Sequence, residues 1–170
     1  TNAGSFDVSL SKSLSRVATA FFNFAQELTP QQQQEGRMYC NDFQCYPACK
    51  ETLESYLTIG AKRYPEFSNK GVTAHFWRLL SALGVAKSLP HSVNADVNSY
   101  QSDSFLMGTD LEACPLVSST GINTTGGQEI RLSVKGLTDG TANGIARRCW
   151  AMIHSECIID VKSTGAHLLT

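Results

Sequence analysis

The alternation of apolar and polar positions indicates strands early in the chain. Residues 5–10 alternate strictly, which is typical of a strand with one buried face. Residues 16–25 and 53–61 are rich in aromatic, small and β-branched side chains, as in core strands, although a short helix stays open for the first of them. We expect the second run to end at Tyr64-Pro65, because proline disfavours continued pairing.

One segment has the periodicity of a helix. Thr73 is placed to cap it, and Gly84 stands where a helix terminator is expected. The spacing predicts a helix over residues 73–83, with Phe76, Leu80 and Leu83 turned inward. Its apolar residues recur on neighbouring turns: Phe76, Trp77, Leu79, Leu80 and Leu83.

The rest of the chain contains short apolar runs separated by turns. The Gln31 to Gln34 tract is expected to be an exposed loop. The runs are residues 105–108, 116–117, 130–134, 149–153 and 158–161, with turn signals at 125–127, Asp139-Gly140 and Asn143-Gly144, and with Gly165 ending the last run. Many short strands with one helix predict a mainly β fold, a jelly-roll β-sandwich with one short helix.

The last two runs predict an anchor for the sandwich. Trp150 and Ile153 are expected to be core residues, and a hairpin over residues 149–161 is expected to hold the two layers together. Replacing Trp150 with Ala should then cost about 3–5 kcal/mol through lost burial and a cavity.

Length and charge narrow the class of protein. The 170 residues suit a single domain, 1–170, and the start at Thr1 rather than Met leaves room for a fragment or processed piece of a longer chain. A net charge of −1 without a basic stripe argues against strong nucleic-acid binding. No apolar run approaches the ~18 residues of a membrane span. The low charged fraction, 17%, suggests a surface that meets other protein.

Candidate chemistry is sparse. No G-x-S-x-G motif accompanies the serines Ser92 and Ser155, and no histidine pair has the spacing of a common metal site. The glycine-rich segment 121–127 lacks the ending of a phosphate-binding loop. His154-Ser155-Glu156, with Asp160 nearby, fits a hairpin turn or an inter-strand role better than an acid/base pair. The histidines are His75, His91, His154 and His167.

The cysteines also favour a structural role. We expect the thiols to be largely reduced, and we expect no metal, no cofactor and no catalytic residue. Cys149 and Cys157 lie in hydrophobic runs, where a free cysteine usually acts as a small buried apolar group. The set is Cys40, Cys45, Cys49, Cys114, Cys149 and Cys157.

Several separated motifs, in this order, carry a resemblance to a known family. They are Ile59-Gly60-x-Lys62-x-Tyr64-Pro65-Glu66, Ala74-x-Phe76 with Leu83-Gly84, Phe105-x-x-Gly108-x-Asp110-Leu111-Glu112, Thr120-Gly121-Ile122-Asn123-Thr124, Arg148 ahead of His154-Ser155-Glu156-x-Ile158, and Gly165. Together they resemble the C-terminal portion of double-jelly-roll major capsid proteins of Polinton-type and related viruses, over about residues 53–164. Two features depart from that pattern: the Gln31 to Gln34 tract, and the three cysteines that lie close together in the sequence, Cys40, Cys45 and Cys49.

The resemblance implies a function in assembly. It implies a jelly roll in a trimeric capsomer that tiles the capsid of a virion assembled inside the host cell, with self-association and neighbouring capsid subunits as partners. A complete double jelly roll needs far more than 170 residues, so either the other half is missing or this is a single-roll relative. The rival is a receptor- or glycan-binding jelly-roll module with its function in the loops around 94–103 and 121–128. An enzyme is the third hypothesis, because a fold alone never excludes catalysis.

Overall fold

The computed structural model describes residues 5–26, 30–34, 51–84, 97–102, 105–112, 121–137, 147–163 and 165–169. Strands dominate these residues, which confirms the mainly β fold. The strands are β1 (Phe6–Leu10), β2 (Val17–Gln26), β3 (Glu54–Ile59), β4 (Lys62–Lys70), β5 (Met107–Asp110), β6 (Ile130–Lys135), β7 (Arg147–Ser155), β8 (Ile158–Lys162) and β9 (Gly165–Leu169). The helices are α1 (Pro30–Gln34), α2 (Gly71–Ala82) and α3 (Val97–Ser102).

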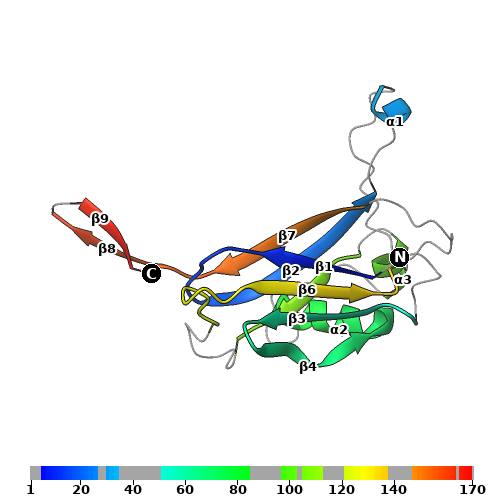
Figure 1. Cartoon of the computed structure of the whole chain (residues 1–170), viewed down its shortest axis with the longest axis horizontal. Helices are drawn as coiled ribbons and strands as arrows, with labels where there is room; N and C mark the ends of the chain where they lie inside the picture. Colours follow the sequence, from blue (N-terminus) through cyan, green and yellow to red (C-terminus); the bar gives the residue numbers. More distant parts are fainter. Residues whose placement is uncertain are drawn as a thin grey trace.

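Two antiparallel sheets form the body of the molecule (Figure 1). One has the strand order β1-β6-β3-β4 and the other the order β5-β2-β7. Three of the pairs are nested along the chain: β1 with β6, β2 with β5, and β3 with β4. A separate two-stranded sheet, β8 with β9, extends from one end. The arrangement is consistent with a β-sandwich.

The core lies between the two sheets because each strand turns its alternate apolar residues inward. In β1 the odd positions are exposed and the even ones partly buried, as the alternation over 5–10 predicts. The rings of Phe6 in β1 and Phe24 in β2 meet edge to face with centroids 5.2 Å apart, so they join the two sheets. The buried core includes Val17, Ala20, Phe22, Phe24, Leu57, Ile59, Ile130, Leu132 and Val134.

Helix α2 packs beside β5 and adds its own apolar face to the core. Gly108 of β5 permits the close approach, because a Cβ there would lie 3.2 Å from the Cα of Leu79. From α2 the core continues through Phe76 to Tyr100 of α3 and then to Phe105, with ring centroids 5.2 and 5.3 Å apart. The hydroxyl of Tyr100 donates to the carbonyl of Leu106.

The predicted helix is confirmed, but its ends are shifted and the residues that it buries are not all those predicted. It begins at Gly71, and the residue before it, Lys70, makes no side-chain cap, so Thr73 is not the cap. Gly84 ends it as expected, with φ +72° and its N–H donating to the Ser81 carbonyl at 3.0 Å. Phe76 is buried as predicted and Leu80 partly so, but Leu83 is 37% exposed. The buried residues are Val72, His75, Phe76 and Leu79.

Three local predictions are wrong. Pro65 does not end a strand but lies within β4, which is tolerated because β4 is the edge strand of its sheet. The Gln31 to Gln34 tract is exposed at both Gln31 and Gln34 but helical, because proline suits the first helical position and glutamine is a fair helix former. Helix α3 lies inside the expected loop 94–103.

The expected late anchor is also wrong. Strand β7 pairs with β2 at the edge of its sheet, and β8 pairs with β9, so no hairpin forms over 149–161. Trp150 is 50% exposed because it lies on the outward side of β7, whereas Ile153 is partly buried against the core. Gly165 begins β9 rather than ending a run. The predicted run 116–117 and the turns at 139–140 and 143–144 lie outside the described residues.

Candidate functional site

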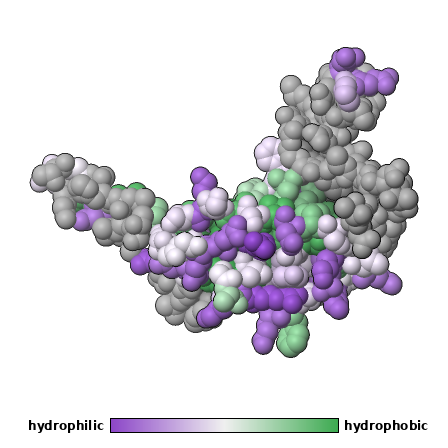
Figure 2. Space-filling model, viewed as in Figure 1, coloured by the Kyte–Doolittle hydropathy of each residue, from purple (hydrophilic) through white to green (hydrophobic). Residues whose placement is uncertain are grey.

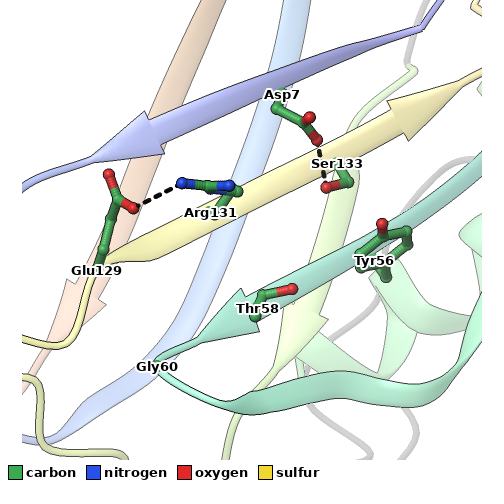
Figure 3. A pocket seen from close by; sticks show the side chains of 7 residues that line it. All are labelled: Asp7, Tyr56, Thr58, Gly60, Glu129, Arg131 and Ser133. Atoms are coloured by element: carbon green, nitrogen blue, oxygen red, sulfur yellow. Dashed lines mark hydrogen bonds and ion pairs between the residues drawn. The ribbon is translucent and has the colours of Figure 1, made fainter.

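A polar hollow lies on the outer face of the four-stranded sheet (Figure 3). It encloses about 400 Å³. Strand register builds it, because residues opposite each other on paired strands point to the same face. Asp7 of β1 pairs with Ser133 of β6, which pairs in turn with Tyr56 of β3. In the adjoining row Arg131 lies between Ser9 and Thr58.

Hydrogen bonds hold the polar groups of this hollow in place. The Ser133 hydroxyl donates to the Asp7 carboxylate, and an Arg131 nitrogen donates to the Glu129 carboxylate at 3.1 Å. A hydrogen bond from Ser9, followed by the bond from Arg131, lowers the pKa of Glu129 below its usual value. Glu129 is therefore ionised at neutral pH, and the hollow offers a guanidinium beside carboxylates.

An aromatic ring borders the hollow. The guanidinium of Arg63 lies 3.7 Å from the centroid of the Tyr56 ring, a cation–π contact that fixes the ring against the sheet. Aromatic rings together with fixed donors and acceptors are what a small polar ligand meets in a binding site. Figure 2 shows hydrophilic residues over much of this side of the body. The hollow therefore gathers charged groups, hydroxyl groups and one aromatic ring on a single face of the sheet.

A second hollow of about 280 Å³ adjoins the loop 121–128 that the binding-module hypothesis favours. This loop is fixed to the start of β2. Ile122 exchanges two backbone hydrogen bonds with Val17, of 2.8 and 2.9 Å. Thr124 is fully buried and accepts a hydrogen bond from the N–H of Leu14 at 2.9 Å. A Cβ at Gly121 would lie 2.6 Å from the Arg16 carbonyl carbon, so only glycine fits there.

The histidines singled out in the sequence are dispersed. His75 is buried in α2, where Ser55 of β3 lies 2.7 Å from its Nε2 atom. His154 is exposed near the end of β7, and His167 lies in β9 in register with Asp160. His91 and Ser92 are outside the described residues. A Ser–His pair at 4% and 2% exposure is closed to a substrate.

The remaining sequence candidates are not brought together. Ser155 ends β7 and Glu156 follows it, so this segment connects strands of two different sheets, which fits the expected inter-strand role and not the hairpin turn. Burial raises the pKa of the Cys149 thiol to about 11, which keeps it protonated and unreactive. Cys157 is exposed, contrary to expectation. Cys40, Cys45, Cys49 and Cys114 lie outside the described residues.

The described part of the chain has neither a metal-binding cluster nor a membrane-spanning helix. It holds no group of three or more His, Cys, Asp or Glu side chains placed to bind a metal ion. It also holds no helix of the length and apolarity that crossing a membrane requires.

Sequence reasoning missed the residues of the larger hollow. They are Asp7, Tyr56, Thr58, Gly60, Glu129, Arg131 and Ser133. The sequence does show the polar residues that alternate with apolar ones along each strand. Only the pairing of β1, β6 and β3 brings the polar residues of the three strands together on one face. A comparison with known proteins finds no family model that matches the chain, and no curated protein or solved structure that is significantly similar to it. Fold and site therefore define a β-rich protein with a polar sheet face.

Proposed function

We propose that this chain is a structural subunit of a viral capsid, a jelly-roll domain that associates into trimeric capsomers. The observation that carries the proposal is the nesting of the strand pairs β1–β6, β2–β5 and β3–β4. A jelly roll is a long antiparallel hairpin rolled into two sheets, and nested pairs of this kind are its signature. Here three nested pairs replace the usual four, and β7 adds a strand beside β2.

Exposed apolar side chains also support a role in assembly. Single exposed apolar residues are normal on a monomer, but large ones on several sides of one body suit a subunit with several neighbours. The largest exposed fractions belong to Phe67 (82%), Val161 (75%), Trp77 (63%), Ile159 (58%), Met152 (52%) and Trp150 (50%). They come from β4, α2, β7 and β8.

The chemistry of the described residues favours structure over catalysis. Ser55 and His75 are within hydrogen-bond distance, but both are buried in the core side of the sheet. A nucleophile and base must reach a substrate to act. The pair therefore supports the packing of α2 against β3.

Self-association is the expected result for the purified chain. Because a capsomer is held by contacts between copies, sedimentation velocity and light scattering should show trimers or larger assemblies that grow with protein concentration. Electron microscopy of the same material should show trimers or shells. A chain that stays monomeric up to capsid-like concentrations contradicts the proposal.

The polar hollow favours one alternative, a glycan-binding module. Its fixed carboxylates and guanidinium match the hydroxyl groups of a sugar. If the alternative holds, a glycan screen should find a ligand whose binding is lost on Arg131→Ala and on Thr58→Trp, which fills the hollow. Thr73→Trp, at an exposed position of α2, serves as the control and should bind normally. This alternative is contradicted if no glycan in the screen binds, or if binding persists in both the Arg131→Ala and the Thr58→Trp variants.

A further inference from the structure

The hairpin of β8 and β9, called the arm from here on, stands away from the body (Figure 1). Within the described residues neither strand pairs with the two large sheets. Ile159 and Val161 of β8 are 58% and 75% exposed, so the arm has apolar residues without a core. A two-stranded hairpin alone is at best marginally stable in water, so the arm needs a third element to pack against.

The root of the arm is fixed to the body. The N–H of Glu156 donates to the Arg16 carbonyl at 3.1 Å, and the Glu156 carbonyl accepts a hydrogen bond from the Ser15 hydroxyl at 3.3 Å. Only Glu156 and Cys157 separate β7 from β8. Because this short link is bonded to the segment before β2, the arm leaves the body instead of folding back over β7.

Strand β7 presents a matching surface. It has nine residues and lies at the edge of its sheet, so its outer side is open to strand addition in the described part of the chain. Trp150 lies opposite Asn23 and Met152 opposite Phe21, so both side chains share the outward face of the sheet. They are 50% and 52% exposed. An exposed edge strand with apolar side chains is a site for pairing with another chain.

We propose that the arm of one copy adds to the β7 edge of a second copy of this chain, with Ile159 and Val161 against Trp150 and Met152. The inference rests on the proposed function and deepens it, because the second copy is the neighbouring subunit. Each chain has one arm and one β7 edge, so the contact is head-to-tail. Head-to-tail contacts related by a closed rotation form a ring, such as a trimer.

The size of the contact agrees with a second copy as the occupant. The exposed parts of the four apolar side chains, two on the arm and two on β7, amount together to on the order of 400 Å² that the contact would bury. Strand addition also buries the backbone of both strands and the rest of the arm, which brings each contact toward the roughly 1,000 Å² that a specific interface needs. Three such contacts in a ring reinforce one another.

Two double variants of the full chain test the proposal. The arm variant is Ile159→Asp with Val161→Asp, and the edge variant is Trp150→Asp with Met152→Asp. Each is expected to weaken self-association at least about tenfold in sedimentation velocity, because a charge is placed in an apolar contact. The control Thr73→Asp places a charge at an exposed polar position of α2 that belongs to neither surface, and it is expected to change association less than about twofold.

Mixing the two variants identifies the partner of the arm. The edge variant keeps an intact arm and the arm variant keeps an intact β7 edge, so an equimolar mixture is expected to form mixed dimers that neither variant forms alone. If arms paired with arms, the edge variant would associate normally and the mixture would gain nothing, which overturns the proposal. Protection of β7 amides in hydrogen exchange should rise with wild-type concentration, and no rise also overturns it.

The outcomes separate this proposal from the proposed function. If trimers or shells persist unchanged in both double variants, the arm contact is wrong and the capsid proposal stands. If the wild-type chain is monomeric at all concentrations, the capsid proposal fails as well. Circular dichroism must match the wild type, and urea unfolding must show that both double variants are fully folded under the assay conditions, which is expected because all four residues are at least half exposed.

Discussion

Replacing Phe22 with Ala is expected to lower the free energy of unfolding by about 3–5 kcal/mol. Phe22 is 1% exposed at the centre of β2, the strand between β5 and β7, so its loss leaves a cavity in the middle of the core. A typical domain has only roughly 5–15 kcal/mol of stability in total, so the variant should be close to unfolding. The measurement is the urea midpoint followed by circular dichroism.

Trp150→Ala is the matched control for this substitution. Trp150 lies on the neighbouring strand of the same sheet, but half of its surface is exposed. The change should cost about 1 kcal/mol, the usual size for a position that is neither core nor cap. Equal losses for the two variants would mean that the core does not lie between the sheets. This expectation replaces the large effect that the sequence alone predicts for Trp150.

The sequence predicts an element well where buried and exposed residues alternate regularly over a few positions. Strict alternation over residues 5–10 gives β1 together with its half-buried face, and residues 130–134 give β6. Gly84 correctly marks the end of α2, because its positive φ is required by the local turn. Each of these outcomes depends on residues within a few positions, so sequence is sufficient.

Long-range partners could not be predicted in the same way. An apolar strand such as β7 looks like a core strand until its place in the sheet is known, and at the edge its outward face leaves Trp150 and Met152 exposed. The polar hollow depends on three strands, with Asp7 and Ser133 separated by 126 positions in the chain. No local pattern encodes that proximity, because it follows from the nested pairing.

His75 shows why a side chain's environment outweighs its type. Its Nδ1 atom lies 2.7 Å from the Gly71 carbonyl, which can only accept, so Nδ1 carries the proton. Its Nε2 atom therefore accepts from the Ser55 hydroxyl, also at 2.7 Å. The neutral ring thus joins the first turn of α2 to β3 with both nitrogens satisfied. The position of His75 in the predicted helix does not reveal these two hydrogen bonds, because one of them comes from a distant strand.

The second large effect is a loss of stability in mild acid that depends on His75. Burial lowers the pKa of His75 below its usual 6.5, and this outweighs the hydrogen bond to the Gly71 carbonyl, which raises it. Below pH 6.5 the unfolded chain therefore binds more protons at this site than the folded chain. The contribution is fully present above pH 6.5 and is lost as the pH falls toward the lower folded value, at up to about 1.4 kcal/mol per pH unit.

A His75→Gln variant isolates this effect. Glutamine keeps a donor and an acceptor but does not titrate, so the variant should be less stable than the wild type at pH 7.5 by about 1–3 kcal/mol, through imperfect hydrogen bonds in a buried site. Its unfolding midpoint should then change less than that of the wild type between pH 7.5 and 5.5. This window lies above the range of Glu54 and Glu129, whose pKa values are lowered from 4.5, Glu54 mainly by a hydrogen bond from Ser68 and Glu129 mainly by one from Ser9. Parallel pH profiles for the two proteins would show that His75 is not held neutral between α2 and β3.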